Sequence, residues 1–218
     1  MRTALPLAAV IAALLGGLAA RAQERRLLDE VVAVVEAQTI TLSELEAETR
    51  IQLALLRGPG VVDVALGRPL LAASLRRLVD ERVVLAEVER LRLFDLDRND
   101  VELAQKRLRE KFGSIAAYEG FLRQLEMTDD EVGAVVARGL RVARYLDNRL
   151  RLPSQLRDSE LDDAARAAGA QALGKAQREE LRMRLQREKY EKLLTDLLAE
   201  LRRRSSVRIL DSLGGTSE

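Results

Sequence analysis

The sequence predicts a mainly α-helical protein whose single domain is closed by a small β-sheet, formed by an N-terminal hairpin and a C-terminal strand. Charged residues make up 33% of the chain and aromatic residues only 3%, and the abundance of Ala, Leu, Arg and Glu favours helices. Apolar residues also recur at three- and four-residue steps between helix-capping signals. β-like segments occur only near the two ends, and a lone short strand needs a partner to be stable.

The first 22 residues are expected to be an export signal and not part of the fold. Arg2 gives a positive start, residues 4–18 carry no charge, and Ala20-Arg21-Ala22 supplies the small-x-small pattern that a signal peptidase requires. The apolar stretch is about 15 residues long, shorter than the roughly 20 that cross a bilayer as a helix. An uncleaved N-terminal anchor is the alternative. Cleavage would leave a periplasmic protein without a stable membrane anchor.

After the signal, the pattern predicts a hairpin followed by a helix. Residues 31–35 alternate weakly, and residues 39–41 continue after a short break, although the turn lacks the expected Gly or Asn. Thr41 then opens a capping box with Glu44, in which the hydroxyl and the carboxylate satisfy free backbone N–H groups. This helix is expected to run to about Leu56, because Arg57-Gly58-Pro59-Gly60 is a strong breaker.

Similar signals delimit the later elements. Pro69 suits a first helical turn, Asp97 and Ser114 can cap, Thr128 forms a second capping box with Glu131, and Pro153 ends a helix. The expected helices are Pro69 to about Leu91, Arg98 to about Phe112, Ile115 to Leu125, Thr128 to about Leu150, Glu160 to Ala168, and about Ala176 to Arg203. Val207-Arg208-Ile209-Leu210 is strand-like, and residues 211–218 are expected to be a flexible tail.

These elements are expected to form one domain over residues 23–210. Its first part covers residues 28–158, residues 159–175 form a short connection, and residues 176–210 supply a closing helix and strand. Because the last strand needs a partner, we expect it to pair with the hairpin at residues 31–41. That pairing would place the C-terminal helix against the N-terminal helices.

The composition excludes several functions. The chain has no His and no Cys, so it can form neither a disulfide nor a thiol or His-bearing catalytic site, and no zinc or other transition-metal site is expected. Without residues 1–22 it has 34 basic and 35 acidic residues, which argues against nucleic-acid binding. Arg202-Arg203-Arg204 is interpreted as the favourable cationic end of a helix rather than a phosphate site. No cofactor is predicted.

Two acidic clusters could be imagined as metal or acid–base sites. They are Asp129-Asp130-Glu131 and the group Asp158, Glu160, Asp162 and Asp163. Both lie at predicted helix starts, where the helix dipole favours negative charge. Their spacing does not match a calcium loop, and no His completes a transition-metal site. The capping interpretation is therefore preferred, and no metal is expected.

The order of these segments resembles the core domain of the SurA-type periplasmic chaperones. The resemblance depends on residues 29–36 followed by 40–45, on the helix Leu78-Val79-Asp80-Glu81-Arg82-Val83-Val84-Leu85, and on Leu201-Arg202 with the strand at 207–210. One or two parvulin-type prolyl isomerase domains normally interrupt that family's chain. Here residues 153–175 occupy that place, far fewer than the roughly 50 of a small domain. The resemblance thus implies a chaperone core without isomerase activity.

The function implied by the resemblance is ATP-independent holding of unfolded outer-membrane proteins or extended peptides, on a concave and partly apolar surface. The candidate peptide-binding residues are Phe94, Phe112, Tyr118, Phe121, Leu122 and Met127. Phe112 and Phe121 could equally be core residues, whereas Tyr118 and Met127 suit an adaptable surface. Tyr145 and Tyr190 are expected in the core.

The alternatives are a dedicated adaptor of an envelope export or secretion system and, less favoured, an isomerase. The client and the oligomeric state stay open, a homodimer included.

Overall fold

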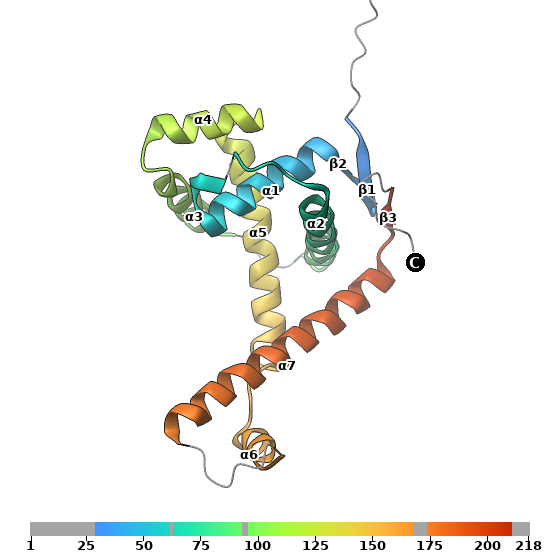
Figure 1. Cartoon of the computed structure of the whole chain (residues 1–218). Helices are drawn as coiled ribbons and strands as arrows, with labels where there is room; N and C mark the ends of the chain where they lie inside the picture. The colour runs from blue at the N-terminus through green and yellow to red at the C-terminus, as the bar shows by residue number, and fades with distance from the viewer. Residues whose placement is uncertain (1–28, 62, 93–95, 168–173, 211–218) are drawn as a thin grey trace, which may run out of the picture.

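The computed structural model describes residues 29–61, 63–92, 96–167 and 174–210, and these residues form a mainly helical fold with a small sheet, as predicted (Figure 1). The expected signal at residues 1–22 and tail at residues 211–218 lie outside the described residues. In chain order the elements are β1 (Val31–Val35), β2 (Gln38–Thr41), α1 (Leu42–Arg57), the 3-10 helix η2 (Pro59–Val61), α2 (Arg68–Arg90), α3 (Arg98–Lys111), α4 (Ile115–Leu125), α5 (Asp129–Leu150), α6 (Asp158–Ala167), α7 (Lys175–Arg204) and β3 (Val207–Ile209).

The two ends of the fold meet in one antiparallel sheet of order β2-β1-β3. Val34 of β1 lies opposite Arg208 of β3, and the backbone N–H of Leu210 donates to the carbonyl of Val32 over 2.9 Å. The predicted pairing of the last strand with the hairpin is therefore confirmed. The turn manages without Gly because Glu36 itself adopts a left-handed conformation with φ of 53°. Its carboxylate accepts a hydrogen bond from the Ser206 N–H, which ties the turn to the entry of β3.

The capping residues begin the helices where the sequence predicts. The hydroxyl of Thr41 accepts from the N–H of Glu44, and Asp97 and Ser114 cap α3 and α4 in the same way. Thr128 and Glu131 form both halves of the capping box of α5. Because these signals are local, the observed boundaries differ from the expected ones by only one or two residues.

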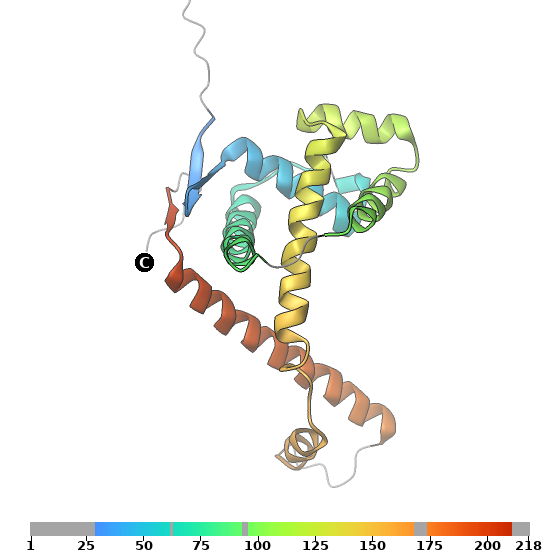
Figure 2. The same cartoon turned by 180° about the vertical axis from the view of Figure 1, so that it is seen from behind.

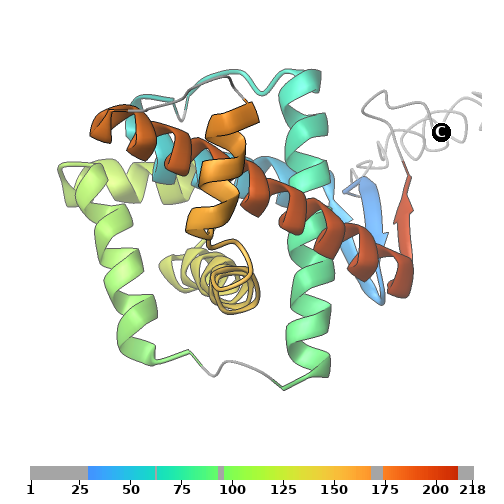
Figure 3. The ribbon, with the colours of Figure 1, turned by 90° about the horizontal axis from the view of Figure 1, so that it is seen from below.

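The interior consists of two apolar clusters joined by α5. The sheet-side core packs β1 and β2 against α2, the end of α5 and the end of α7; its members include Val32, Ile40, Val79, Val83, Tyr145 and Leu201. The helical core lies among α1, α3, α4 and the start of α5; its members include Ile51, Leu108, Phe112, Tyr118, Phe121 and Val132. Seen from below, α5 is viewed along its axis with α2 and α3 on either side (Figure 3).

Helix α7 packs against the rest of the fold through its C-terminal half. Its last turns pack on α2 and lead into β3, while its first half extends away from α1–α4 and packs on α6 (Figures 1 and 2). Leu161 and Ala165 of α6 are buried against this half. The described part of the predicted short connection therefore packs down as a helical hairpin with α7.

Candidate peptide-binding surface

Three of the four aromatic candidates lie in the interior of the helical core. Phe112, Tyr118 and Phe121 are 8%, 5% and 3% exposed, and the rings of Phe112 and Phe121 stack with centroids 4.8 Å apart. The expectation that Tyr118 offers an adaptable surface is therefore wrong, and the core alternative holds for Phe112 and Phe121. The reason is the short Gly113-Ser114 link, which folds α4 back so that all three rings meet. Phe94 lies outside the described residues.

Tyr118 satisfies its polar end inside the protein. Its hydroxyl donates to Oδ1 of Asp129 over 2.6 Å, and Arg109 donates to the other carboxylate oxygen over 2.9 Å. Burial, together with this hydrogen bond, raises the pKa of Tyr118 far above its usual range. The hydroxyl therefore stays protonated as a structural donor, and Asp129 fastens α3 and α4 to the start of α5.

Leu122 and Met127 are the candidates that stay partly accessible. Both are half-buried at the edge of the helical core, and both line a shallow depression beside Arg123 and Glu126. The other two tyrosines follow the expectation: Tyr145 is buried and Tyr190 packs against the sheet-side core. Of the six candidates, the structure thus brings Leu122 and Met127 to one surface.

Met127 also lines a second cavity, which we call the acidic groove. It has a volume of about 410 Å³ and lies between α1 and α5 beside the turn that joins α4 to α5. Its apolar lining comes from Ala47, Leu125, Met127, Ala134 and Val135, and its charged lining from Glu44, Glu48, Glu126, Glu131 and Arg138. A cleft of this size, lined by both apolar and charged side chains, suits a short stretch of peptide.

A buried ion network forms the floor of the acidic groove. Glu48 accepts from Arg82 over 3.0 Å and also pairs with Arg138, while Arg82 pairs with Glu44 as well. Burial raises the pKa of Glu44, and the neighbouring Glu48 charge adds to this effect against the attraction of Arg82. The network was missed in the sequence because its members lie on three helices that only packing brings together.

The acidic residues of α6 hold the hairpin together. Asp158, Glu160 and Asp162 pair with Arg182, Lys189 and Arg178 of α7 at 2.6, 2.9 and 2.8 Å. The capping interpretation holds for Glu160, which accepts from the N–H of Arg157, but the cross-helix pairs were not foreseen. Within the described ranges, no group of three or more acidic residues is arranged to hold a metal ion.

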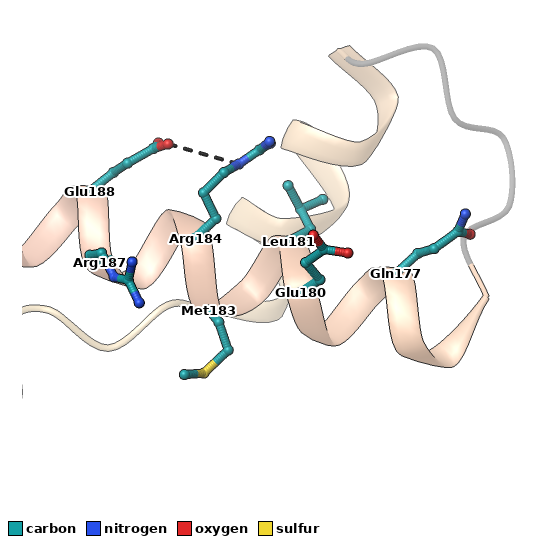
Figure 4. Close-up of a pocket in the computed structure, with 7 residues that line it drawn as sticks. All are labelled: Gln177, Glu180, Leu181, Met183, Arg184, Arg187 and Glu188. Atoms are coloured by element: carbon teal, nitrogen blue, oxygen red, sulfur yellow. Dashed lines mark ion pairs between the residues drawn. The ribbon is translucent and has the colours of Figure 1, made fainter.

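Two other depressions are less suited to a peptide. One of about 590 Å³ lies along α7, and every lining residue comes from that helix, with Met183 pointing away from the Arg184–Glu188 ion pair (Figure 4). The other, between α3 and α5, has basic and acidic residues in balance, such as Arg98, Lys106, Glu102 and Asp130. The first depression has walls from one helix alone, and charged and polar side chains make up most of the lining of the second.

Fold and groove define a mainly α-helical protein with a sheet in which β3 pairs with β1, and with a cleft walled by α1, α5 and the turn before α5. In the part of the chain that the structure describes, no helix is both long and apolar enough to span a bilayer. No protein-family model matches the sequence, and no curated protein matches it either.

Proposed function

We propose that this protein is a periplasmic, ATP-independent holdase chaperone that binds unfolded outer-membrane protein segments without prolyl isomerase activity. The observation that carries the proposal is the pairing of β3 with β1, with α7 lying on α2. This is the arrangement that the resemblance to the SurA-type core implies. The export signal expected at residues 1–22 supports the periplasm as the place of action.

The acidic groove offers the surface that holding requires. Met127 lies in the turn between α4 and α5, where its flexible thioether can adapt to different client side chains. The groove is open and small, so one client would be held through several weak contacts and released without a nucleotide. The absence of His from the whole chain and the packing of α6 on α7, in the place of an isomerase domain, favour binding without catalysis.

The test is dilution of an urea-unfolded β-barrel protein into buffer with and without this protein, followed by light scattering. Suppressed aggregation is expected, and a peptide cis/trans assay should show no rate above the spontaneous one, which takes tens to hundreds of seconds. Met127→Ser should weaken protection, whereas Met183→Ser, at an exposed methionine on α7, should not. Aggregation that proceeds unchanged at several-fold molar excess would overturn the proposal.

A dedicated adaptor in an envelope export or secretion system is the second candidate. It is favoured by the first half of α7, which extends from the helical body and presents Met183 at 56% exposure. A single-helix face of this kind suits one fixed protein partner. Affinity capture from envelope extracts separates the two proposals, because a chaperone should retain many outer-membrane proteins and an adaptor one stoichiometric partner.

A further inference from the structure

We infer that the acidic groove selects extended peptide segments in which an apolar residue and a Lys or Arg are two positions apart. This inference rests on the proposed function and names the class of client segment that the groove accepts. It follows from the distribution of charge and apolar surface around the cavity. In an extended peptide, residues two positions apart lie on the same face, about 6.8 Å from each other.

The groove has more carboxylates than cations. Four glutamates line it, namely Glu44, Glu48, Glu126 and Glu131, whereas Arg138 is the one lining cation among the described residues. Arg82 neutralises part of this charge from behind, through Glu44 and Glu48. The charges of Glu44 and Glu48 are thus compensated by arginines of the protein itself. The excess of negative charge in the groove therefore comes from the outer pair, Glu126 and Glu131.

Glu126 and Glu131 form that outer pair, and both are exposed. Neither has an ion-pair partner within 4.0 Å among the described residues. Glu131 accepts hydrogen bonds from the N–H and hydroxyl of Thr128, and these bonds hold the pKa of its carboxyl below the ordinary value. Its negative charge is therefore fixed in place at neutral pH. A ligand that approaches the groove meets these two charges first.

Apolar residues line the same groove as these two glutamates. Leu125 and Val135 are buried in the lining of the groove, and Glu126 lies between Leu125 and the half-buried Met127 in the chain. An apolar client side chain can pack on Leu125, Met127 and Val135. A Lys or Arg two residues away in the client can then reach the carboxylates of Glu126 and Glu131. The long aliphatic stems of Lys and Arg suit such a position, because the stem packs on apolar surface and the charged head stays at the carboxylates.

Binding of fluorescent ten-residue peptides to the purified protein tests the inference. One peptide carries Leu-Ser-Arg at its centre, and its partners carry Leu-Ser-citrulline, a neutral isostere, or Leu-Ser-Glu. At low salt the Arg peptide should bind about three- to tenfold more tightly than the citrulline peptide, since rim ion pairs are individually weak. The difference should shrink as salt screens the charges. Equal affinities would overturn the inference.

Two double variants test whether the preference for the Arg peptide arises in the acidic groove. Glu126→Gln with Glu131→Gln should abolish the preference for Arg, and Gln at position 131 still completes the capping box of α5. Glu179→Gln with Glu191→Gln removes the same charge from exposed sites on α7 and should leave the preference intact. A preference that survives the first variant, or disappears in the second, would contradict the assignment to this groove.

Failure of the inference can be told from failure of the proposed function. If the unfolded β-barrel protein is protected but the peptides bind equally, only the selection of basic segments is wrong. If the client is not protected and no peptide binds, the holdase function itself is wrong. Circular dichroism melting curves of each variant establish that a lost preference does not come from lost structure.

Discussion

The guanidinium of Arg82 on α2 donates to the carboxylate of Glu48 on α1 over 3.0 Å, and both side chains are buried. Glu48 also receives Arg138 from α5, so one carboxylate fastens the three helices together beneath the acidic groove. The geometry of the proposed binding surface therefore depends on charges in the interior. This relationship leads to the first of four predictions.

Replacing Glu48 with Gln should destabilise the protein by about 3 kcal/mol, because it leaves the buried Arg82 with Glu44 as its remaining carboxylate and frees Arg138. Urea unfolding measures the change. The matched control is Glu81→Gln at pH 7, which breaks the more exposed pair with Arg77. A cost for Glu48→Gln no larger than that of the control would show that the network does not hold the three helices.

Proline at position 208 should loosen the closure of the domain. Leu210 donates to Val32 and Ser206 accepts from Glu36, so by alternation the N–H of Arg208 faces Val34 of β1. Arg208→Pro removes that donor and should cost about 1–3 kcal/mol. Ile209→Pro, whose N–H faces the free edge, is the control. Hydrogen exchange at the Leu210 N–H should accelerate in the first variant alone; equal exchange in both would contradict the register.

Removing the Tyr118 hydroxyl should weaken the helical core. Tyr118→Phe loses the 2.6 Å hydrogen bond to Asp129 and should cost about 1.5–3 kcal/mol, the range for hydrogen bonds to charged groups. Tyr145→Phe is the control, because Tyr145 is also a buried residue but its hydroxyl forms no hydrogen bond with another residue of the described part of the chain. Thermal or urea unfolding compares the two. Equal costs would mean that the Asp129 contact contributes nothing.

Glu81 and Glu87 of α2 should make opposite contributions to the pH dependence of the free energy of unfolding. Burial raises the pKa of Glu81 above its ordinary 4.5, against the attraction of Arg77, so ionisation of Glu81 destabilises the folded state. Wild type should therefore lose stability relative to Glu81→Gln as the pH rises from 4.5 towards the raised pKa of the folded state. Below that window both states are protonated and the two proteins should match more closely.

Ionisation of Glu87 has the opposite effect on the stability of the folded state. The hydrogen bonds from Arg90 lower the pKa of Glu87 below 4.5, so its carboxylate stabilises the folded state above that pH. Relative to Glu87→Gln, wild type should lose this contribution as the pH falls through the lowered pKa. Urea unfolding between pH 3 and pH 7 measures both differences. Curves of the same sign for the two variants would contradict the described environments.

The prediction of individual positions from sequence succeeded where the signal is local and failed where it depends on neighbours. Thr41, Asp97, Ser114 and Thr128 are caps because each binds a backbone N–H two or three residues away. Tyr118 was misplaced because its surroundings also depend on Phe112 after α3 and on Asp129 of α5, which pack against α4. Its amphipathic ring fits a surface or an interior equally well until those partners are known.

The amino-acid sequence by itself determined the helices and their ends, because capping and breaking act within short stretches of chain. It also predicted the pairing of the last strand with the hairpin, because a lone short strand needs a partner. Only the tertiary structure decided which side chains face solvent. It buried Phe112, Tyr118 and Phe121, joined Glu48 to Arg82 and Arg138, and left Met127 beside the exposed Glu126 and Glu131. Burial and charge compensation depend on residues far apart in the chain, and packing alone brings those residues together.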